Sequence, residues 1–415
     1  MHAVLICPPL PSHLRAFEAL AAELTRRGHR ATFVTEPGVQ LQSDVAQVTL
    51  PGGPVARQPK QLIAEILTGA RRTDRFCQDA PAVIRSLQPD VILGDQMEPA
   101  AGLLARFLRL PLASVACAVP MENEPGIPLP FLGWPYDTSL EGLRRNAGGA
   151  RVAGLMMTPH AAVIRRWALR WGLTQRTLQD CISDRLTLSQ MAPGFDYPRP
   201  RNGQHIFEIG PFRRGESEQP FPNDIVPDPA RPLVYASLGT LQGHRAELLS
   251  RISVACRRAG AQVLVSHAGC LTDKQARDIP ADWVRHFVPQ RAVLARADLC
   301  VTHAGLNTAL ECLTAGVPML ALPLTHDQPG VAARIVHHGV GLRLTRFQRG
   351  AAQIEAAVRR LLTDPVYQSA VSSFAADAPS LGGAKAAIDA VEGMLGTVPH
   401  GFGLSSGPNQ VHRLD

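Results

Sequence analysis

The sequence predicts an α/β protein of two doubly wound domains, each with a parallel sheet covered by helices. Short apolar runs, too short for helices, alternate along the chain with segments whose apolar residues recur at helical spacing. The alternation occurs twice, on either side of a proline-rich stretch at 213–232. Because parallel strands are joined by long crossovers, usually helices, this pattern is typical of layered α/β domains.

The first domain is predicted to begin with a buried strand, because residues 3–7 form a short, wholly apolar run. A turn-rich loop at 8–13 leads into a helix at 14–27, which carries an apolar stripe and ends before Gly28. The remaining elements predicted for this domain are strands at 30–35, 91–94 and 112–117, a helix at 99–108, and a proline- and glycine-rich loop at 120–137 of a kind that often lines sites.

The second domain repeats the pattern after the proline-rich stretch. Its predicted elements are strands at 233–237, 262–266, 299–302 and 319–322, a turn at 238–243, and helices at 244–259, 306–315, 330–338, 351–363 and 384–395. We therefore expect an N-terminal domain at 1–212, a linker at 213–232, a C-terminal domain at 233–397 whose last helix is able to pack back on the N-terminal domain, and a flexible tail at 398–415.

Composition narrows the class of protein. Hydrophobic residues make up 45% of the 415 residues and charged residues 19%, which is typical of a globular chain. Charge-free stretches such as 110–121 and 316–325 are too short to span a bilayer, and the N-terminus lacks the pattern of a signal peptide. The eight cysteines form no C-x-x-C pair, so we expect no zinc site, no disulfide framework and a cytoplasmic location.

The net charge of +7 rests almost wholly on arginine. Charge of this sign suits nucleic acid, anionic lipid or phosphorylated substrates equally well. Aromatic residues are only 5% of the chain and no nucleic-acid-binding motif occurs, so we expect no nucleic-acid partner.

The densest group of polar residues is the segment His303-Ala-Gly-Leu-Asn-Thr308, which follows a predicted strand and opens a helix. Gly305 lets the backbone approach a ligand closely, and the free N–H groups of a helix N-terminus favour a phosphate. His303 adds a hydrogen bond, and Glu311, one turn after Asn307, suits ribose hydroxyls. Taken alone, the segment favours a purely structural interpretation, an N-capped helix with a buried histidine.

Neighbouring segments favour the binding interpretation. Phe287-Val-Pro-Gln290 is a bend that is able to place a ring and an amide against a base. The segment at 316–323 leads to Asp327 and Gln328, short polar groups suited to paired hydrogen bonds with sugar hydroxyls. The turn at 237–240 follows the first strand of this domain and provides a second phosphate-contacting turn, although by itself it is no more than a strand-to-helix connection.

This arrangement resembles the family 1 glycosyltransferases of the GT-B fold, which transfer sugar from a nucleotide diphosphate. The family's donor box, F-x-P-Q, H-x-G-x-N-T-x-x-E, G-x-P and D-Q, spans 287–328 in the expected order and spacing. The resemblance implies two Rossmann-like domains that face an interdomain cleft. It also implies these donor-binding residues: Ser237, Gly239, Thr240, Phe287, Val288, Gln290, His303, Gly305, Asn307, Thr308, Glu311, Asp327 and Gln328.

The same resemblance assigns roles to these residues. Phe287 would lie beside the uracil, where many relatives have tryptophan, so stacking is expected to be weaker. Gln290 would reach the uracil–ribose end and Glu311 the ribose hydroxyls. Asp327 and Gln328 would bind the hexose hydroxyls. The diphosphate would be held by His303, Asn307, Thr308 and Thr240.

Four further segments resemble a subgroup of this family, the bacterial zeaxanthin glucosyltransferases. They lie at 95–99, 124–130, 236–245 and 327–334. The resemblance implies UDP-glucose as co-substrate, no other cofactor, and a lipophilic hydroxylated acceptor, a carotenoid such as zeaxanthin. The residues expected at the acceptor are Pro11, Glu98, Pro120, Glu124 and Pro125.

His13 and Asp95 are the predicted catalytic residues. Each follows a predicted strand of the first domain, at the carboxyl edge where α/β folds place their sites. A neutral imidazole accepts a hydroxyl proton near pH 7, and a carboxylate on its other nitrogen fixes the tautomer. Glu98 lies one turn from Asp95 and is an alternative partner for His13, and the resemblance to glycosyltransferases supports the catalytic interpretation.

Residues 142–176 carry seven arginines and no acidic residue, with Trp167 and Trp171 four positions apart. A basic amphipathic helix with tryptophan suits an anionic bilayer, which would place the protein on the inner face of the membrane. The alternative is a solvated helix whose tryptophans close the core or the acceptor pocket, and the pattern favours this alternative for the helix as a whole.

The resulting hypothesis is an inverting glucosyltransferase that moves glucose from UDP-glucose to carotenoid hydroxyls and gives mono- and di-β-glucosides. No D-x-D-like motif is placed to hold a metal, so the hypothesis includes none. Three alternatives remain: a glycosyltransferase of the same family acting on a macrolide, polyketide or flavonoid, a nucleotide-sugar epimerase, and a non-catalytic nucleotide-sugar binder. Arg334 either contacts substrate or caps its helix, and it is assigned no role.

Overall fold

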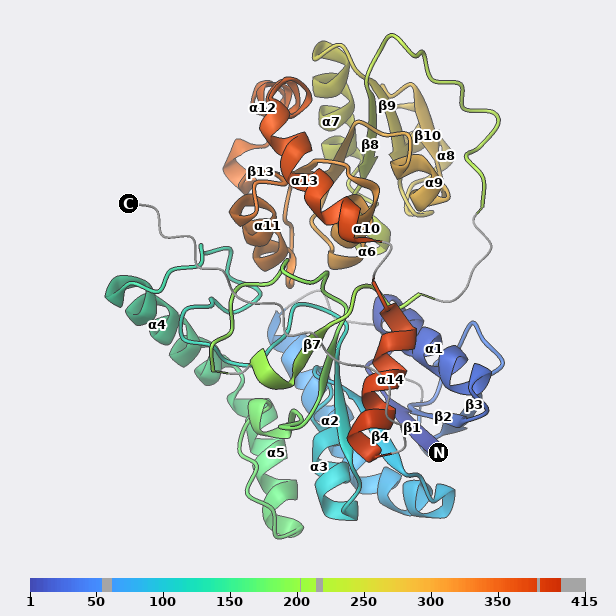
Figure 1. The fold of residues 1–415 in the computed structure, drawn as a ribbon, viewed down its shortest axis with the longest axis vertical. Coiled ribbons are helices and arrows are strands. Elements are labelled where there is room, and N and C mark those ends of the chain that lie inside the picture. The colour runs from blue at the N-terminus through green and yellow to red at the C-terminus, as the bar shows by residue number, and fades with distance from the viewer. Residues whose placement is uncertain (54–61, 202, 214–218, 379–380, 397–415) are drawn as a thin grey trace.

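The computed structural model describes residues 1–53, 62–201, 203–213, 219–378 and 381–396, and it shows two parallel sheets (Figure 1). The first sheet has the order β3-β2-β1-β4-β5-β6-β7. Its strands are β1 (His2–Ile6), β2 (Arg30–Thr35), β3 (Ala46–Thr49), β4 (Val91–Asp95), β5 (Leu112–Ala116), β6 (Thr187–Ser189) and β7 (Ile206–Glu208). All neighbouring strands pair in parallel, as predicted for a doubly wound domain.

The second sheet has the order β10-β9-β8-β11-β12-β13 and is also parallel throughout. Its strands are β8 (Leu233–Ser237), β9 (Gln262–Ser266), β10 (Trp283–Arg285), β11 (Leu299–Thr302), β12 (Met319–Ala321) and β13 (Gly341–Arg343). In both sheets the strand order reverses at one point, between β1 and β4 in the first and between β8 and β11 in the second. Doubly wound sheets bind ligands at these points.

Helices cover both sheets (Figure 1). Those of the first half of the chain are α1 (Pro11–Arg26), α2 (Leu62–Leu87), α3 (Ala100–Leu108), α4 (Leu140–Met156) and α5 (Thr158–Arg170). Those of the second half are α6 (Gly239–Gln242), α7 (Ala246–Arg258), α8 (Asp273–Arg277), α9 (Gln290–Leu294), α10 (Leu306–Ala315), α11 (Gln328–His337), α12 (Ala351–Thr363), α13 (Pro365–Asp377) and α14 (Gly383–Leu395). Short 3₁₀ turns occupy Gln179–Cys181, Gly203–His205 and Arg346–Gln348.

The first helix begins earlier than the sequence predicts. Residues 8–13 were expected to be a loop, but α1 starts at Pro11, which places His13 in its first turn. Proline suits this position because its fixed φ matches the helix and its missing N–H would have no partner there. His13 is thus held on a rigid element rather than on a loop.

The segment at 142–176 is not one helix. The chain forms α4 and α5, which meet at Met157, and Pro159 stands in the first turn of α5. Trp167 belongs to the buried core beneath β4, and Trp171 packs against the same core. The interpretation in which the tryptophans close the core is therefore confirmed, and they do not face solvent as part of an amphipathic surface.

Sequence patterns miss several elements. The long helix α2 was not predicted, although its buried residues Ala70, Phe76, Ala80 and Ile84 recur at helical spacing on either side of Pro81. The strands β6, β7, β10 and β13 are only three residues long, too short for a recognisable pattern. The turn expected at 238–243 contains the short helix α6.

The two halves of the chain cross over each other. Helix α14 packs against α1 (Figure 1), and its apolar residues Ala387, Ile388 and Val391 complete the buried core of the first sheet. In the other direction, Met191 and Phe195, which follow β6, belong to the core of the second sheet. The predicted tail at 398–415 lies outside the described residues, as does part of the predicted linker.

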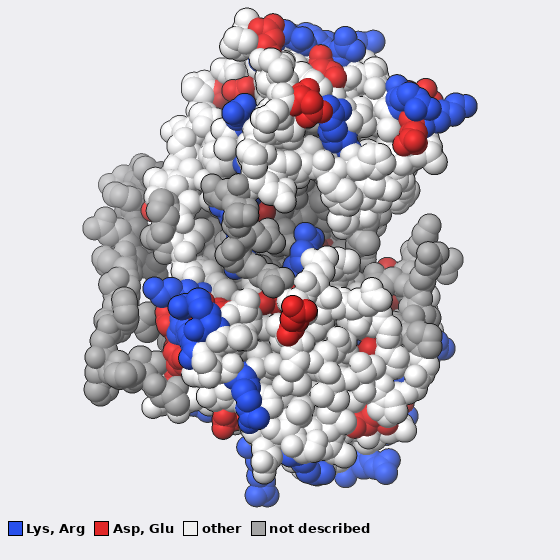
Figure 2. All heavy atoms as spheres, turned by 90° about the vertical axis from the view of Figure 1, so that its right-hand side faces the viewer, with Lys and Arg blue, Asp and Glu red and all other residues white. Residues whose placement is uncertain are grey.

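The two crossing segments lie side by side. The amide of Gly383 donates a hydrogen bond to the carbonyl of Ile209, and Leu381 lies against Gly210. A pocket of about 380 Å³ opens next to them between α1, α10 and α14. The side view in Figure 2 shows that the molecular surface is hollowed between the two domains. This crossing is one of several places where the two domains meet.

Candidate active site

His13 and Asp95 meet at the point where the strand order of the first sheet reverses. His13 lies in the first turn of α1, which follows β1, and Asp95 is the last residue of β4. The Nδ1 atom of His13 lies 2.6 Å from Oδ2 of Asp95, and both residues are buried. Because the carboxylate accepts the Nδ1 proton, the Nε2 atom keeps its lone pair and is able to accept a proton from a substrate.

The pKa of His13 is raised above its ordinary value. Burial alone would lower it, but the charge and the hydrogen bond of Asp95 raise it by more. Asp327, from the second domain, also lies close enough for its charge to raise the pKa of His13. The predicted base and a predicted hexose-binding residue are therefore brought together from opposite domains.

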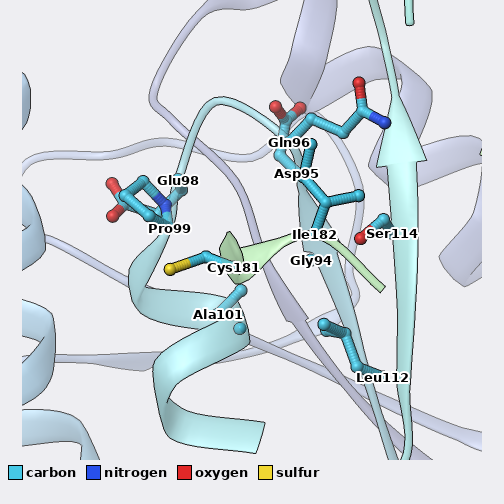
Figure 3. Close-up of a pocket in the computed structure, with 11 residues that line it drawn as sticks. Gly94, Asp95, Gln96, Glu98, Pro99, Ala101, Leu112, Ser114, Cys181 and Ile182 are labelled. Atoms are coloured by element: carbon cyan, nitrogen blue, oxygen red, sulfur yellow. The ribbon is translucent and has the colours of Figure 1, made fainter. Parts of the chain in front are cut away.

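Glu98 does not compete with Asp95 for His13. Its side chain turns away from the end of β4 (Figure 3), where its Oε1 atom accepts a hydrogen bond of 2.8 Å from Thr73, and Arg72 lies 4.0 Å from its other oxygen. Only 1% of Glu98 is exposed, and burial raises its pKa to about 7. The space that Glu98 lines in Figure 3, between β4, α3 and Cys181, lies within the first domain and is too tight to hold even a water molecule.

One group of described side chains has the spacing of metal ligands: His13, Asp95 and Cys117, whose ligand atoms lie within 4.8 Å of one another. Burial raises the pKa of the Cys117 thiol well above its ordinary value, so it stays protonated at neutral pH, whereas a metal binds the thiolate. The Nδ1 atom of His13 is also already engaged with Asp95. This donor set therefore suits a proton-transferring pair better than a metal centre.

The predicted diphosphate site lies at the corresponding point of the second sheet. Gly239 follows β8, and His303 and Gly305 follow β11. The His303 ring lies directly against both glycines, because a Cβ atom added to Gly239 or Gly305 would stand 2.5–2.6 Å from it. Burial lowers the pKa of His303 to about 4, so its ring is neutral and donates through one nitrogen only.

The predicted ribose end is a hydrogen-bonded cluster. Gln290 donates to Oε2 of Glu311 over 2.6 Å, and its Nε2 lies 3.5 Å from Thr308. Tyr235 donates from its hydroxyl to Oε1 of Gln290 over 3.0 Å. Tyr235 is a residue that sequence reasoning missed, although a tyrosine in the otherwise aliphatic strand β8 was a visible signal. Phe287, the predicted base-stacking residue, is 68% exposed and so available to a base.

The predicted hexose-binding residues stand where α11 begins. Gln328 is buried, and its Oε1 atom accepts hydrogen bonds from the amides of Leu324 and Thr325. Gln328 therefore fixes the loop that carries Asp327, the residue preceding the helix. Burial raises the pKa of Asp327, and the charge of His13 opposes this effect.

The remaining predicted residues lie around these groups. Ser237 ends β8 and accepts a hydrogen bond from the amide of Gly239, Thr240 is exposed, Val288 packs against the core, and Asn307 is half-buried in the first turn of α10. Among the predicted acceptor residues, Pro11 and Pro125 are exposed, whereas Pro120, Glu98 and Glu124 are buried. The last three therefore shape the site from behind rather than line an open surface.

Replacing Glu311 by alanine is expected to raise KM for the nucleotide sugar by about 10- to 100-fold, because hydrogen bonds to charged groups contribute roughly 1.5–3 kcal/mol. Glucoside formation at varied donor concentration measures the change. Glu247→Ala is the matched control, since the side chain of Glu247 is exposed on α7, where it pairs with Arg251 at the surface. An unchanged KM in the Glu311 variant would contradict its predicted role at the ribose.

Comparison with known proteins identifies the family. A model of the UDP-glucoronosyl and UDP-glucosyl transferases matches residues 178–380. The chain is 39% identical over 363 residues to the zeaxanthin glucosyltransferase of Pseudescherichia vulneris, covering 84% of this chain and 87% of that protein. It is 36% identical over 421 residues to the zeaxanthin glucosyltransferase of Pantoea ananas, covering 95% and 96%.

Solved structures agree on the fold. The glycotransferase of kitacinnamycin superposes with a TM-score of 0.78 at 22% identity, over 95% of this chain and 99% of that one. A calicheamicin glycosyltransferase gives 0.75 at 24% identity, over 96% and 98%. The predicted pair of Rossmann-like domains is thereby confirmed as the GT-B fold. The chain therefore belongs to the UDP-glucoronosyl and UDP-glucosyl transferase family and is a UDP-glycosyltransferase.

Proposed function

We propose that this enzyme transfers glucose from UDP-glucose to the hydroxyl groups of a carotenoid, zeaxanthin, and forms mono- and di-β-glucosides. Two relatives that share more than a third of their residues with it over most of their length are zeaxanthin glucosyltransferases. The observation that carries the catalytic part is the His13–Asp95 pair, with Asp327 of the other domain facing it.

In this proposal each domain supplies one half of the reaction. The second domain holds UDP-glucose, with the diphosphate at the start of α10 and the hexose at Asp327 and Gln328. The Nε2 atom of His13 takes the proton of an acceptor hydroxyl, and the oxygen attacks the anomeric carbon from the face opposite UDP, which inverts its configuration. Asp95 keeps the imidazole in the required tautomer and stabilises its protonated form.

Departure of UDP is assisted by groups already in place. The amides at the N-terminus of α10 carry partial positive charge, and the neutral His303 ring, hydrogen-bonded to the Ser237 backbone, lies beside them. These groups stabilise the charge that develops on the diphosphate as the bond to glucose breaks.

A product assay tests the proposal. Purified enzyme, UDP-glucose and zeaxanthin in detergent are expected to give two successive hexose additions, resolved by chromatography with mass detection. Release of UDP without formation of a carotenoid glucoside would indicate that the natural acceptor is another lipophilic alcohol. Conversion of the sugar nucleotide without any acceptor would instead indicate an epimerase.

We also propose that α4 rests on an anionic membrane surface, where a carotenoid would be found. Most of the second half of α4 is exposed, with Leu155 75% exposed beside Val152 and Met156. Arg144 and Arg151 are exposed on the same helix. Apolar side chains among arginines suit the boundary between lipid headgroups and acyl chains. Among the helices that are described, none combines the length and hydrophobicity needed to cross a bilayer.

Sedimentation with vesicles tests this contact. The enzyme is expected to sediment with vesicles that contain anionic phospholipid at low salt, and Leu155→Glu is expected to weaken this binding about 5-fold or more, because it replaces an inserted apolar group by a negative charge. Val366→Glu is the control, since Val366 is an exposed valine on α13 of the other domain. Equal sedimentation of both variants would overturn the role of α4.

A further inference from the structure

Arg334 is the largest of the side chains that are almost completely buried, with 1% exposed. It lies on α11, the helix that starts at the predicted hexose site. Its Nε and Nη2 atoms donate to Oδ1 of Asp196 over 2.7 and 2.5 Å, and its Nη1 donates to the carbonyl of Gly330. Asp196 lies between β6 and β7 of the first sheet. A buried ion pair therefore links the donor helix to the acceptor domain.

Asp196 also binds a second arginine, Arg199, which contacts the acceptor loop. Its Oδ2 atom accepts a hydrogen bond of 2.7 Å from Arg199, whose two Nη atoms donate to the carbonyls of Glu122 and Pro120 over 2.8 and 3.0 Å. Both carbonyls belong to the loop at 120–125, which contains three of the predicted acceptor residues. Two arginines on one buried carboxylate lower its pKa, although burial alone would raise it.

The loop is in turn attached to the catalytic pair. The Glu122 carboxylate accepts a hydrogen bond of 2.8 Å from Gln96, and Gln96 accepts one of 3.0 Å from the amide of Met121. Gln96 is the neighbour of Asp95, and its side chain points to the opposite side from Glu98 (Figure 3). Polar contacts, each buried or half-buried, thus connect α11 to Gln96, the residue next to Asp95.

We propose that Arg334 and Asp196 are positioning residues that fix the donor helix α11 relative to the acceptor loop at 120–125, and thereby align the anomeric carbon with His13. Neither side chain needs to touch a substrate. Their ion pair is dry and carries two or more hydrogen bonds on each side, so it holds its geometry better than an exposed pair would. This inference rests on the proposed hexose contacts of Asp327 and Gln328.

The first experiment separates alignment from binding and folding. Arg334→Lys keeps the charge but loses the planar fork. We expect kcat for glucoside formation to fall about 10- to 100-fold, since a displacement near 1 Å has an effect of this size, while KM for UDP-glucose changes less than about 2-fold. UDP released per glucoside formed is expected to rise, because water replaces a misplaced acceptor.

Arg343→Lys is the matched control, since Arg343 also crosses between the domains, to the carbonyl of Gly133, but stands outside this series of contacts. It is expected to keep the wild-type ratio of UDP to glucoside. If Arg334→Lys does not fold, Arg334→Met removes the link to α11 while Asp196 stays paired with Arg199, and it is expected to show the same raised ratio. A wild-type kcat and ratio in either Arg334 variant would overturn the proposal.

A second readout needs no acceptor. Amide hydrogen exchange in the loop at 120–125 is expected to be faster in Arg334→Lys than in the wild type and in Arg343→Lys. If the wild-type enzyme makes no carotenoid glucoside, the proposed function fails, yet exchange in this loop still decides whether Arg334 holds it. Unchanged amide exchange in this loop of the Arg334 variant would overturn the proposal that Arg334 holds the loop, whatever the acceptor is.

Discussion

Replacing His13 by glutamine is expected to reduce glucoside formation about 10³-fold, because general base catalysis contributes roughly 10²–10⁴ to such reactions. Glutamine still donates to Asp95 but has no basic nitrogen for the acceptor proton. Binding of UDP is expected to be unchanged, since the donor residues lie on the other domain. Single-turnover glucoside formation and calorimetric titration with UDP measure the two quantities separately.

His205→Gln is the matched control, because His205 lies in a short turn at the start of β7, away from the strand ends that carry the pair. It is expected to keep the wild-type rate. If the His13 variant still formed glucoside at more than a tenth of the wild-type rate, another residue would have to be the general base.

The same pair sets the pH dependence. The base must be neutral, and Asp95 raises the pKa of His13 in spite of burial, which would lower it. Activity is therefore expected to fall as the pH drops through a value above 6.5, the ordinary pKa of histidine. In Asp95→Asn this acid limb is expected to move to lower pH, with a lower plateau. A pH profile of kcat/KM with the same acid limb in both proteins would contradict the pairing.

Replacing Gly330 by alanine is expected to disrupt the contact between the domains. A Cβ atom at this position would stand 2.3 Å from the carbonyl oxygen of Pro130, which belongs to the loop at 120–137. Backbone does not yield as a flexible side chain does, so α11 must move away from that loop. We expect a loss of about 1–3 kcal/mol in the free energy of unfolding, together with at least a 10-fold lower kcat.

Gly393→Ala provides the control for a glycine inside a helix. Nothing lies within 4 Å of a Cβ atom added there, and alanine favours helix, so this variant is expected to be as stable as the wild type or about 0.5–1 kcal/mol more stable. Thermal unfolding and glucoside assays on both variants check the pair of expectations. Equal stability and activity in Gly330→Ala would show that α11 and the loop separate easily.

The sequence predicts much of this molecule for a simple reason. Buried parallel strands such as β1 and β8 are short apolar runs, and the turns after them carry glycine and polar residues that serve a ligand. His13 and Asp95 could be paired in advance because both follow strands of one sheet. The distance between the two side chains could not be predicted, since it depends on the reversal of strand order between β1 and β4.

Contacts between distant segments leave no pattern in the sequence. Arg334 could not be assigned because its partner, Asp196, lies 138 positions earlier on the other domain. Tyr235, on strand β8, was missed because its hydroxyl donates to Gln290 of the distant helix α9. Glu98 was a plausible partner for His13 by spacing alone, and only the turn after β4 shows that it points elsewhere. Spacing predicts which residues share an edge, but packing decides which of them meet.

The return of α14 to α1 has a consequence for how the protein can be divided. Residues 383–395 supply the apolar groups that cover one face of α1, so the N-terminal domain is assembled from the two ends of the chain. A fragment that stops at 212 would leave Phe17, Leu20 and Leu24 without their cover and is expected to aggregate. By contrast, a chain cut once in the linker keeps both pieces interlocked, so catalysis is expected to survive a nick but not a truncation.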